Sequence, residues 1–175
     1  MKHILLTLSI LMLSACGGSS GGSDSGDGEL IADEGLFTIQ NVRFDAKDYY
    51  EGEQVTVTEG TSFEVQWVSP TSASYKIDLY LSVNDQGHTD NNKVVELRCG
   101  SASFSLCPNA TGEVQCEINN NELSCSIDDD FLGSEAFQEK DLSSLQFILK
   151  GCDALSHCDV KTFNLSVQKA TSSSQ

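Results

Sequence analysis

Two runs of alternating residues, FEVQW at 63–67 and YKIDLYLSV at 75–83, decide the fold of this chain. In both, a large apolar residue stands at every second position. Because successive side chains of a β-strand point to opposite faces, this period of two predicts two strands, each with a buried face. The loop at 69–72 between them contains Pro70, which cannot donate to a strand ladder.

Shorter apolar or β-branched runs recur on both sides of this unit, separated by polar turns. Together they predict about nine short strands. The nine runs lie at 36–44, 55–58, 63–67, 75–83, 94–97, 114–118, 122–127, 145–150 and 160–167.

Two segments depart from simple alternation. Within 36–44, Phe37 and Ile39 have one parity and Val42 and Phe44 the other, which predicts a bulge or a strand that changes sheets. Residues 128–142 carry apolar residues at helix-like spacing and predict a short helix or a structured crossover loop.

Many short strands without intervening helices predict an all-β protein, a single antiparallel β-sandwich over residues 30–168. The strand number and Trp67 on an early strand resemble an immunoglobulin or fibronectin type III domain. That resemblance is to an architecture and implies no function. No cysteine lies on the strands expected to carry the immunoglobulin inter-sheet bond, and a jelly roll is the alternative.

The N-terminus carries Lys2, an apolar run at 4–13 and then Leu13-Ser14-Ala15-Cys16. This pattern resembles the lipobox of a bacterial lipoprotein signal. The resemblance implies a signal peptide at residues 1–15, cleavage before Cys16 and lipidation of the Cys16 sulfur. Gly17 after the cysteine implies the outer membrane. An uncleaved membrane helix is excluded by length, since spanning needs about 20 apolar residues.

Cys16 and the Gly/Ser/Asp stretch after it, residues 16–29, predict a lipidated cysteine followed by a flexible linker. Residues 169–175 predict a disordered tail. The chain has 10 basic and 26 acidic residues, a formal net charge of −16. This negative charge disfavours binding to nucleic acid, to anionic lipid headgroups and to acidic partners. A basic partner or divalent cations remain compatible with it, and solubility alone is a sufficient reason for it.

Six cysteines follow Cys16, and an even number in an exported protein predicts disulfides. If Asn120-Asn121 is a two-residue turn, Cys116 faces Cys125 at a non-hydrogen-bonded position, where a cross-strand disulfide fits. Proximity in sequence favours Cys99–Cys107 and Cys152–Cys158 for the others. Their gaps do not match the two-to-four-residue spacing of structural zinc ligands, so we expect no metal.

No catalytic motif stands out, and we expect no cofactor. His88 and His157 lie in polar loops and are expected to be solvated surface side chains. Three acidic groups are candidate Ca²⁺ ligands but are better explained as solvated turns. These groups are Asp128, Asp129 and Asp130; Asp45, Asp48 and Glu51; and Asp85 with Asp90. The tyrosines Tyr49, Tyr50 and Tyr80 are candidates for an exposed aromatic contact.

These observations favour a non-enzymatic, lipid-anchored envelope protein that binds a protein or glycan. The alternative is a periplasm-facing structural or accessory subunit of an envelope assembly. A hydrolase with paired carboxylates is a third hypothesis, which no spacing supports.

We predict that Cys16→Ser releases the protein from membranes, because the variant lacks the thioether-linked lipid. Fractionation of cells into membrane and soluble fractions checks this. Retention of the variant in the membrane fraction would reject the lipobox interpretation.

Overall fold

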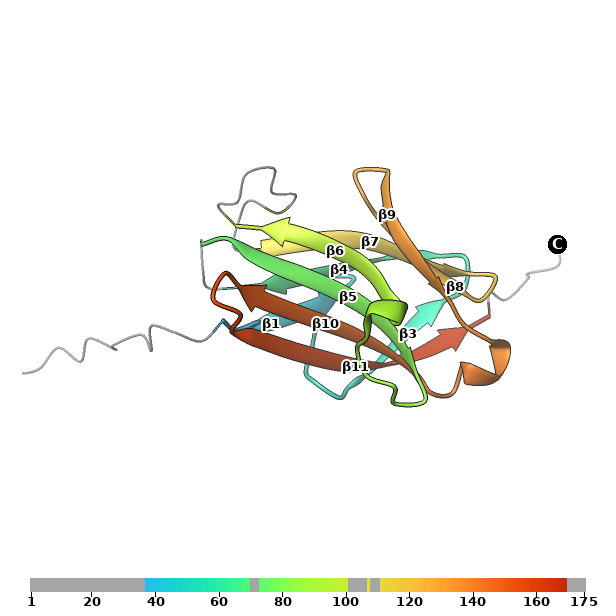
Figure 1. Ribbon diagram of the computed structural model, residues 1–175. Coiled ribbons are helices and arrows are strands. Elements are labelled where there is room, and N and C mark those ends of the chain that lie inside the picture. The colour runs from blue at the N-terminus through green and yellow to red at the C-terminus, as the bar shows by residue number, and fades with distance from the viewer. Residues whose placement is uncertain (1–36, 70–72, 101–106, 108–110, 170–175) are drawn as a thin grey trace, which may run out of the picture. The chain divides into compact units, whose positions relative to one another are not determined.

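The computed structural model describes residues 37–69, 73–100, 107 and 111–169, which lie within one compact unit, Asp33–Gln175 (Figure 1). These residues form eleven strands rather than about nine. The strands are β1 (Asn41–Phe44), β2 (Lys47–Tyr49), β3 (Gln54–Thr58), β4 (Ser62–Val68), β5 (Tyr75–Val83), β6 (Lys93–Cys99), β7 (Thr111–Asn119), β8 (Glu122–Ile127), β9 (Asp130–Ala136), β10 (Leu145–Asp153) and β11 (Cys158–Gln168). Two single-turn 3₁₀ helices lie at Asp90–Asn92 (η1) and Glu139–Asp141 (η2).

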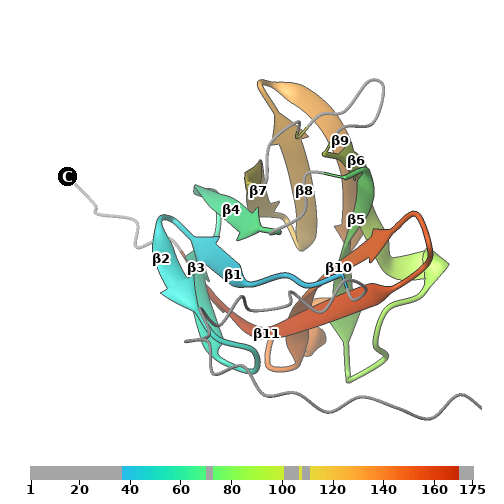
Figure 2. The ribbon, with the colours of Figure 1, turned by 90° about the vertical axis from the view of Figure 1, so that its left-hand side faces the viewer.

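The strands form two sheets that face each other across an apolar core, which confirms an all-β, two-layer fold. Sheet A has the strand order β2-β1-β4-β7-β8-β9, and sheet B has the order β3-β11-β10-β5-β6. The prediction of a purely antiparallel sandwich is wrong at one place, because β3 and β11 run parallel. β3 pairs with β11 and so belongs to sheet B, whereas its successor in sequence, β4, belongs to sheet A (Figure 2).

The expectation of a helix or crossover loop at 128–142 is wrong. Residues 130–136 form β9, which pairs with β8, and only η2 is helical. A bulge between Cys125 and Ser126 shifts the register of this pair, so the apolar residues of β9 do not alternate cleanly. Since the bulge disrupts the period of two, the spacing resembled that of a helix.

Residues 37–40, before β1, explain the parity switch in the 36–44 run. The backbone N–H of Ile39 donates to the Asp159 carboxylate of β11 at 2.7 Å, whereas that of Gln40 donates to the Val68 carbonyl of β4 at 2.9 Å. The chain therefore passes from sheet B to sheet A just before β1, as a strand that changes sheets would.

Three hairpins turn on two residues with positive φ, the requirement of a type I′ turn. The turn residues are Asp45 and Ala46, Asn120 and Asn121, and Asp128 and Asp129. Asn and Asp adopt this conformation more readily than other non-glycine residues, so local sequence favours the registers of the Asn120-Asn121 and Asp128-Asp129 turns, whereas Ala46 in the first turn has no such preference.

The Asn120-Asn121 hairpin places Cys116 opposite Cys125, as predicted, and the two form a disulfide with a Cα–Cα distance of 4.1 Å. Cys152 and Cys158 also form a cross-strand disulfide, between β10 and β11. Cys99 is bonded to Cys107. Each bond closes a short loop and contributes about 2–3 kcal/mol in the chain-entropy description.

Trp67 is fully buried near the C-terminal end of β4. Its indole lies against Gly112 of β7, directly opposite in the ladder, and a Cβ on Gly112 would overlap the ring. A second glycine, Gly133, lies where the edge strands of the two sheets meet. A Cβ at Gly133 of β9 would collide with the Val94 carbonyl of β6. Gly112 therefore permits the close packing of the indole, and Gly133 permits the approach of β9 to β6. Figure 2 shows β9 beside β6.

We predict that Gly112→Ala lowers the free energy of unfolding by about 1–3 kcal/mol, because the added methyl group displaces the Trp67 ring. Denaturant unfolding measures the effect. The control is Glu113→Ala at the exposed neighbouring position, for which a change within about 0.5 kcal/mol is expected. Equal effects of the two substitutions would contradict the packing argument.

Candidate interaction surface

The outer face of sheet B gathers basic side chains on an otherwise acidic protein. Strand alternation and register place four of the ten Lys and Arg residues on this face. They are Lys76 of β5, Lys93 and Arg98 of β6, and Lys150 of β10. The acids among them are Asp78 and Glu96.

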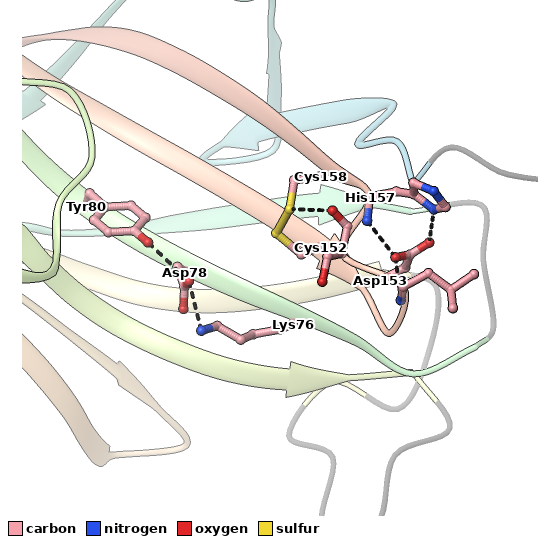
Figure 3. Close-up of a disulfide and its surroundings, with 9 residues drawn as sticks. Lys76, Asp78, Tyr80, Cys152, Asp153, His157 and Cys158 are labelled. Atoms are coloured by element: carbon pink, nitrogen blue, oxygen red, sulfur yellow. Dashed lines mark hydrogen bonds and ion pairs between the residues drawn. A yellow bond between two sulfur atoms is a disulfide. The ribbon is translucent and has the colours of Figure 1, made fainter.

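Asp78 lies at the centre of this charge cluster, and its side chain is 6% exposed. Its carboxylate is 3.1 Å from the Lys76 ammonium and 3.8 Å from that of Lys93, and it accepts a hydrogen bond from the Tyr80 hydroxyl at 3.1 Å. Figure 3 shows Tyr80, Asp78 and Lys76 along one strand. Both lysines also contact Glu96, at 3.0 and 3.2 Å. One carboxylate on β5 thus links the charged residues of two strands.

These contacts and burial shift the pKa values of three groups, Glu96, Lys76 and Tyr80. Hydrogen bonds from Lys93 and Lys76 lower the pKa of Glu96. Burial opposes the charge of Lys76, but Asp78 and Glu96 outweigh it and raise the Lys76 pKa. Burial and the negative charge of Asp78 raise the pKa of Tyr80. Because the folded-state pKa of Glu96 lies below its unfolded value, its stabilisation is present at neutral pH and is lost as the pH falls below about 4.5.

A disulfide-closed loop lies at one end of this face, between β10 and β11. Asp153 accepts backbone hydrogen bonds from Leu155 and His157, both at 2.8 Å, and its other oxygen is 2.9 Å from the His157 imidazole. Figure 3 shows this pair next to the Cys152–Cys158 bond. Opposing burial, the His157 contacts lower the pKa of Asp153. His157 is therefore paired rather than simply solvated, while Leu155 is 78% exposed.

The outer face of sheet A has the opposite charge. Its acids alternate with amides in the β4–β7 ladder, so that carboxylates do not face each other directly. The Gln66 amide donates to Glu113 at 3.2 Å, and the Gln115 amide donates to Glu64 at 3.3 Å. Charge is thus distributed unequally between the two sides of the sandwich, which the net charge of −16 does not reveal.

Two of the three tyrosines differ from the sequence expectation of an exposed aromatic contact, whereas His88 is exposed, as expected. Tyr80 is 3% exposed, because it lies beside the His88 ring at 5.4 Å and bonds to Asp78. Tyr49 is half-buried and packs edge-on against Phe44 at 5.5 Å. Only Tyr50 of the three tyrosines is broadly exposed, at 77%.

Each acidic group has a local structural role. Asp128 and Asp129 form the β8–β9 turn, as the solvated-turn explanation requires. The Asp45 carboxylate accepts the backbone N–H of Glu64 at 2.9 Å, and Asp48 pairs with Arg43 at 2.6 Å. Asp90 lies 3.8 Å from Lys93, Asp85 occupies a positive-φ turn, and Glu51 lines a shallow hollow beside Tyr50. Across the described ranges, no three His, Cys, Asp or Glu side chains converge as metal ligands.

A hollow of about 360 Å³ opens between the end of β5, β9 and η2. Its wall includes Leu81, Phe137, Glu135 and Asp141. Burial raises the pKa of Glu135, whereas the Asp141 carboxylate accepts the Gln138 N–H at 3.2 Å as the cap of η2. Two carboxyl groups from different elements, β9 and η2, therefore line this hollow.

The Cys16 lipidation site, the signal segment and the linker lie outside the described residues. Among the residues that are described, no helix is long and apolar enough to cross a membrane. No known family model matches the sequence, and no curated protein is similar to it.

Sequence reasoning missed the Asp78 cluster and the Glu135 hollow. Alternation at 75–83 places Lys76, Asp78 and Tyr80 on one face, but the register with β6 supplies Lys93 and Glu96. The Glu135 hollow was missed because residues 128–142 were not expected to form a strand.

We predict that Asp78→Asn lowers the free energy of unfolding by about 1–2 kcal/mol at pH 7. This is below the cost of breaking a fully buried pair, since the Lys76 ammonium is partly hydrated. Thermal or denaturant unfolding checks it. Asp90→Asn is the matched control, because Asp90 also contacts Lys93 but is 99% exposed. A control that destabilises as much as Asp78→Asn would refute a central role for Asp78.

Proposed function

We propose that this chain is a lipid-anchored, non-enzymatic binding module of the bacterial envelope, tethered through Cys16 to the outer membrane. Residues 16–29 hold the domain away from the lipid, and the domain contacts a protein or glycan. The lipobox-like residues 13–16 support the anchor. Three disulfides support an oxidising compartment outside the cytoplasm.

The observation that carries a binding role is the fixed charge on the outer face of sheet B. The pKa values of Lys76 and Glu96 are displaced away from neutrality by their ion-pair partners, and that of Tyr80 by burial and by Asp78. A general acid or base works best with a pKa near the working pH, so this displacement suits recognition better than proton transfer. Charges held in place by their neighbours give orientation and selectivity to a contact.

An immunoglobulin-like architecture is part of this proposal. Its support is the pair of facing sheets, with Trp67 fully buried on β4. Domains of this type present loops and sheet edges around a rigid core, which is compatible with a role in adhesion or ligand capture. A periplasm-facing accessory subunit of an envelope assembly is the alternative role for the same surfaces.

A hydrolase is the second candidate function, favoured only by the hollow that Glu135 and Asp141 share. Burial raises the pKa of Glu135, and a carboxylic acid that shares a hollow with a second carboxyl group is the arrangement that glycoside hydrolysis uses. The test is whether the purified protein hydrolyses an envelope polymer and whether Glu135→Gln abolishes that activity. Both results together would establish this function and overturn the binding proposal.

We predict that protease treatment of intact cells removes the folded domain, because a linker-tethered adhesion module faces outward. Detection of the chain before and after treatment, with lysed cells as the control, checks this. Protection in intact cells with loss after lysis would instead support the periplasm-facing subunit. If the chain survives in both samples, labelling intact cells with a membrane-impermeant biotin reagent locates it by the same criterion.

A further inference from the structure

Four strands form the edges of the two sheets, and three of them carry features that discourage pairing with another chain. β2 has only three residues, two of them charged. β6 contains three charged residues and a bulge and lies against β9. β9 carries two acids, a glycine and a bulge. Short length, charge and bulges are the usual protections of edge strands.

The fourth edge, β3, has none of these protections. Its sequence is QVTVT, five residues without a charge, a glycine or a proline. The last four residues are alternating valines and threonines, all of them β-branched and well suited to strand pairing. Val55 and Val57 are buried in the core, and Gln54 and Thr56 are exposed. Within the described residues β3 pairs only with β11, so its other side is open.

The ladder shows which backbone groups point to this open side. Glu53 accepts the Asn164 N–H at 3.0 Å, and the Glu59 N–H donates to Gln168 at 2.8 Å. In a parallel pair alternate residues bond to the partner strand, so the odd-numbered residues face β11. The N–H and C=O groups of Gln54 and Thr56 therefore point away from the sheet.

We propose that the open edge of β3 binds an extended segment of a partner protein, which adds a strand to sheet B and carries basic residues at both ends. This inference rests on the proposed binding role and names the class of partner. Main-chain hydrogen bonds to Gln54 and Thr56 supply the attachment, as in other strand-addition complexes. A protein rather than a glycan fits, because only a polypeptide offers alternating N–H and C=O groups.

The ends of β3 select the charge of the partner. Glu53 and Glu59 flank the uncharged strand at its two ends. The Glu53 carboxylate is held by the Tyr50 N–H at 2.9 Å. Lys169 lines the same hollow as Glu59, but its ammonium is 3.1 Å from Glu139. Basic residues at the ends of an incoming strand would therefore meet a carboxylate on either side.

The same carboxylates disfavour a second copy of this chain as the occupant. Antiparallel self-pairing through all five residues of β3 is centred on Thr56, and it places Glu53 of each copy opposite Glu59 of the other. Like charges directly opposite each other destabilise a strand pair. Charge complementarity thus favours a different, basic-ended chain.

The test uses the mature chain with Cys16→Ser and the labelled peptide Lys-Lys-Thr-Val-Thr-Val-Thr-Lys-Lys as the probe. We expect saturable binding, with slowed hydrogen exchange at the Thr56 amide. We also expect binding about tenfold weaker for an acidic-ended peptide and for one N-methylated at alternate amides. Glu53→Gln combined with Glu59→Gln should reduce the preference for basic ends.

Thr56→Pro removes one outward N–H without touching the β11 ladder, and an edge position tolerates proline. We expect it to abolish peptide binding, whereas Thr56→Ala retains it. If the proline variant does not fold, the N-methylated peptide gives the same information. Absence of peptide binding, equal binding of basic and acidic peptides, or an unprotected Thr56 amide would overturn this inference. If the free chain forms a dimer and Thr56→Pro converts it to a monomer, the inference would also be overturned, in favour of self-pairing. None of these results bears on the cell-surface exposure test of the proposed function.

Discussion

The packing of aromatic rings between the two sheets is the contact on which the rest of the domain depends. Phe44 of sheet A lies 5.5 Å from Phe147 and 5.2 Å from Phe163 of sheet B, both in edge-to-face geometry. All three are almost fully buried. Because neither sheet is stable with its apolar face in water, this contact and the burial around Trp67 fix the distance and alignment of the layers. The hairpins and disulfides stabilise this framework locally.

That framework explains why polar chemistry lies on the outside of the domain. Inward positions of β4, β5, β10 and β11 are filled by large apolar side chains, so charged residues occupy the alternate, outward positions. On sheet B these positions bring β5 and β6 side chains together around Asp78. A rigid sheet therefore holds the charges at set distances, which favours recognition of a partner over proton transfer.

The edges of the sheets complete this picture. Closure between β6 and β9 requires Gly133, since any larger residue would collide with the Val94 carbonyl. At the other end of sheet B, the parallel pairing of β3 with β11 leaves an uncharged edge. The domain is thus protected along one side and open along another, and the open edge lies between Glu53 and Glu59.

Local rules made part of this structure predictable from sequence. The period of two at 63–67 and 75–83 determined two central strands, and Asn120-Asn121 determined the register that joins Cys116 to Cys125, because turn geometry depends only on neighbouring residues. The sequence alone also suggested the lipobox at Leu13–Cys16. Only the tertiary structure decided that residues 130–136 form a strand, that β3 runs parallel to β11, and that Lys93 and Glu96 meet Asp78. Those outcomes depend on which distant segments pair, and burial in the common core, rather than the residues' own preferences, selects among such pairings.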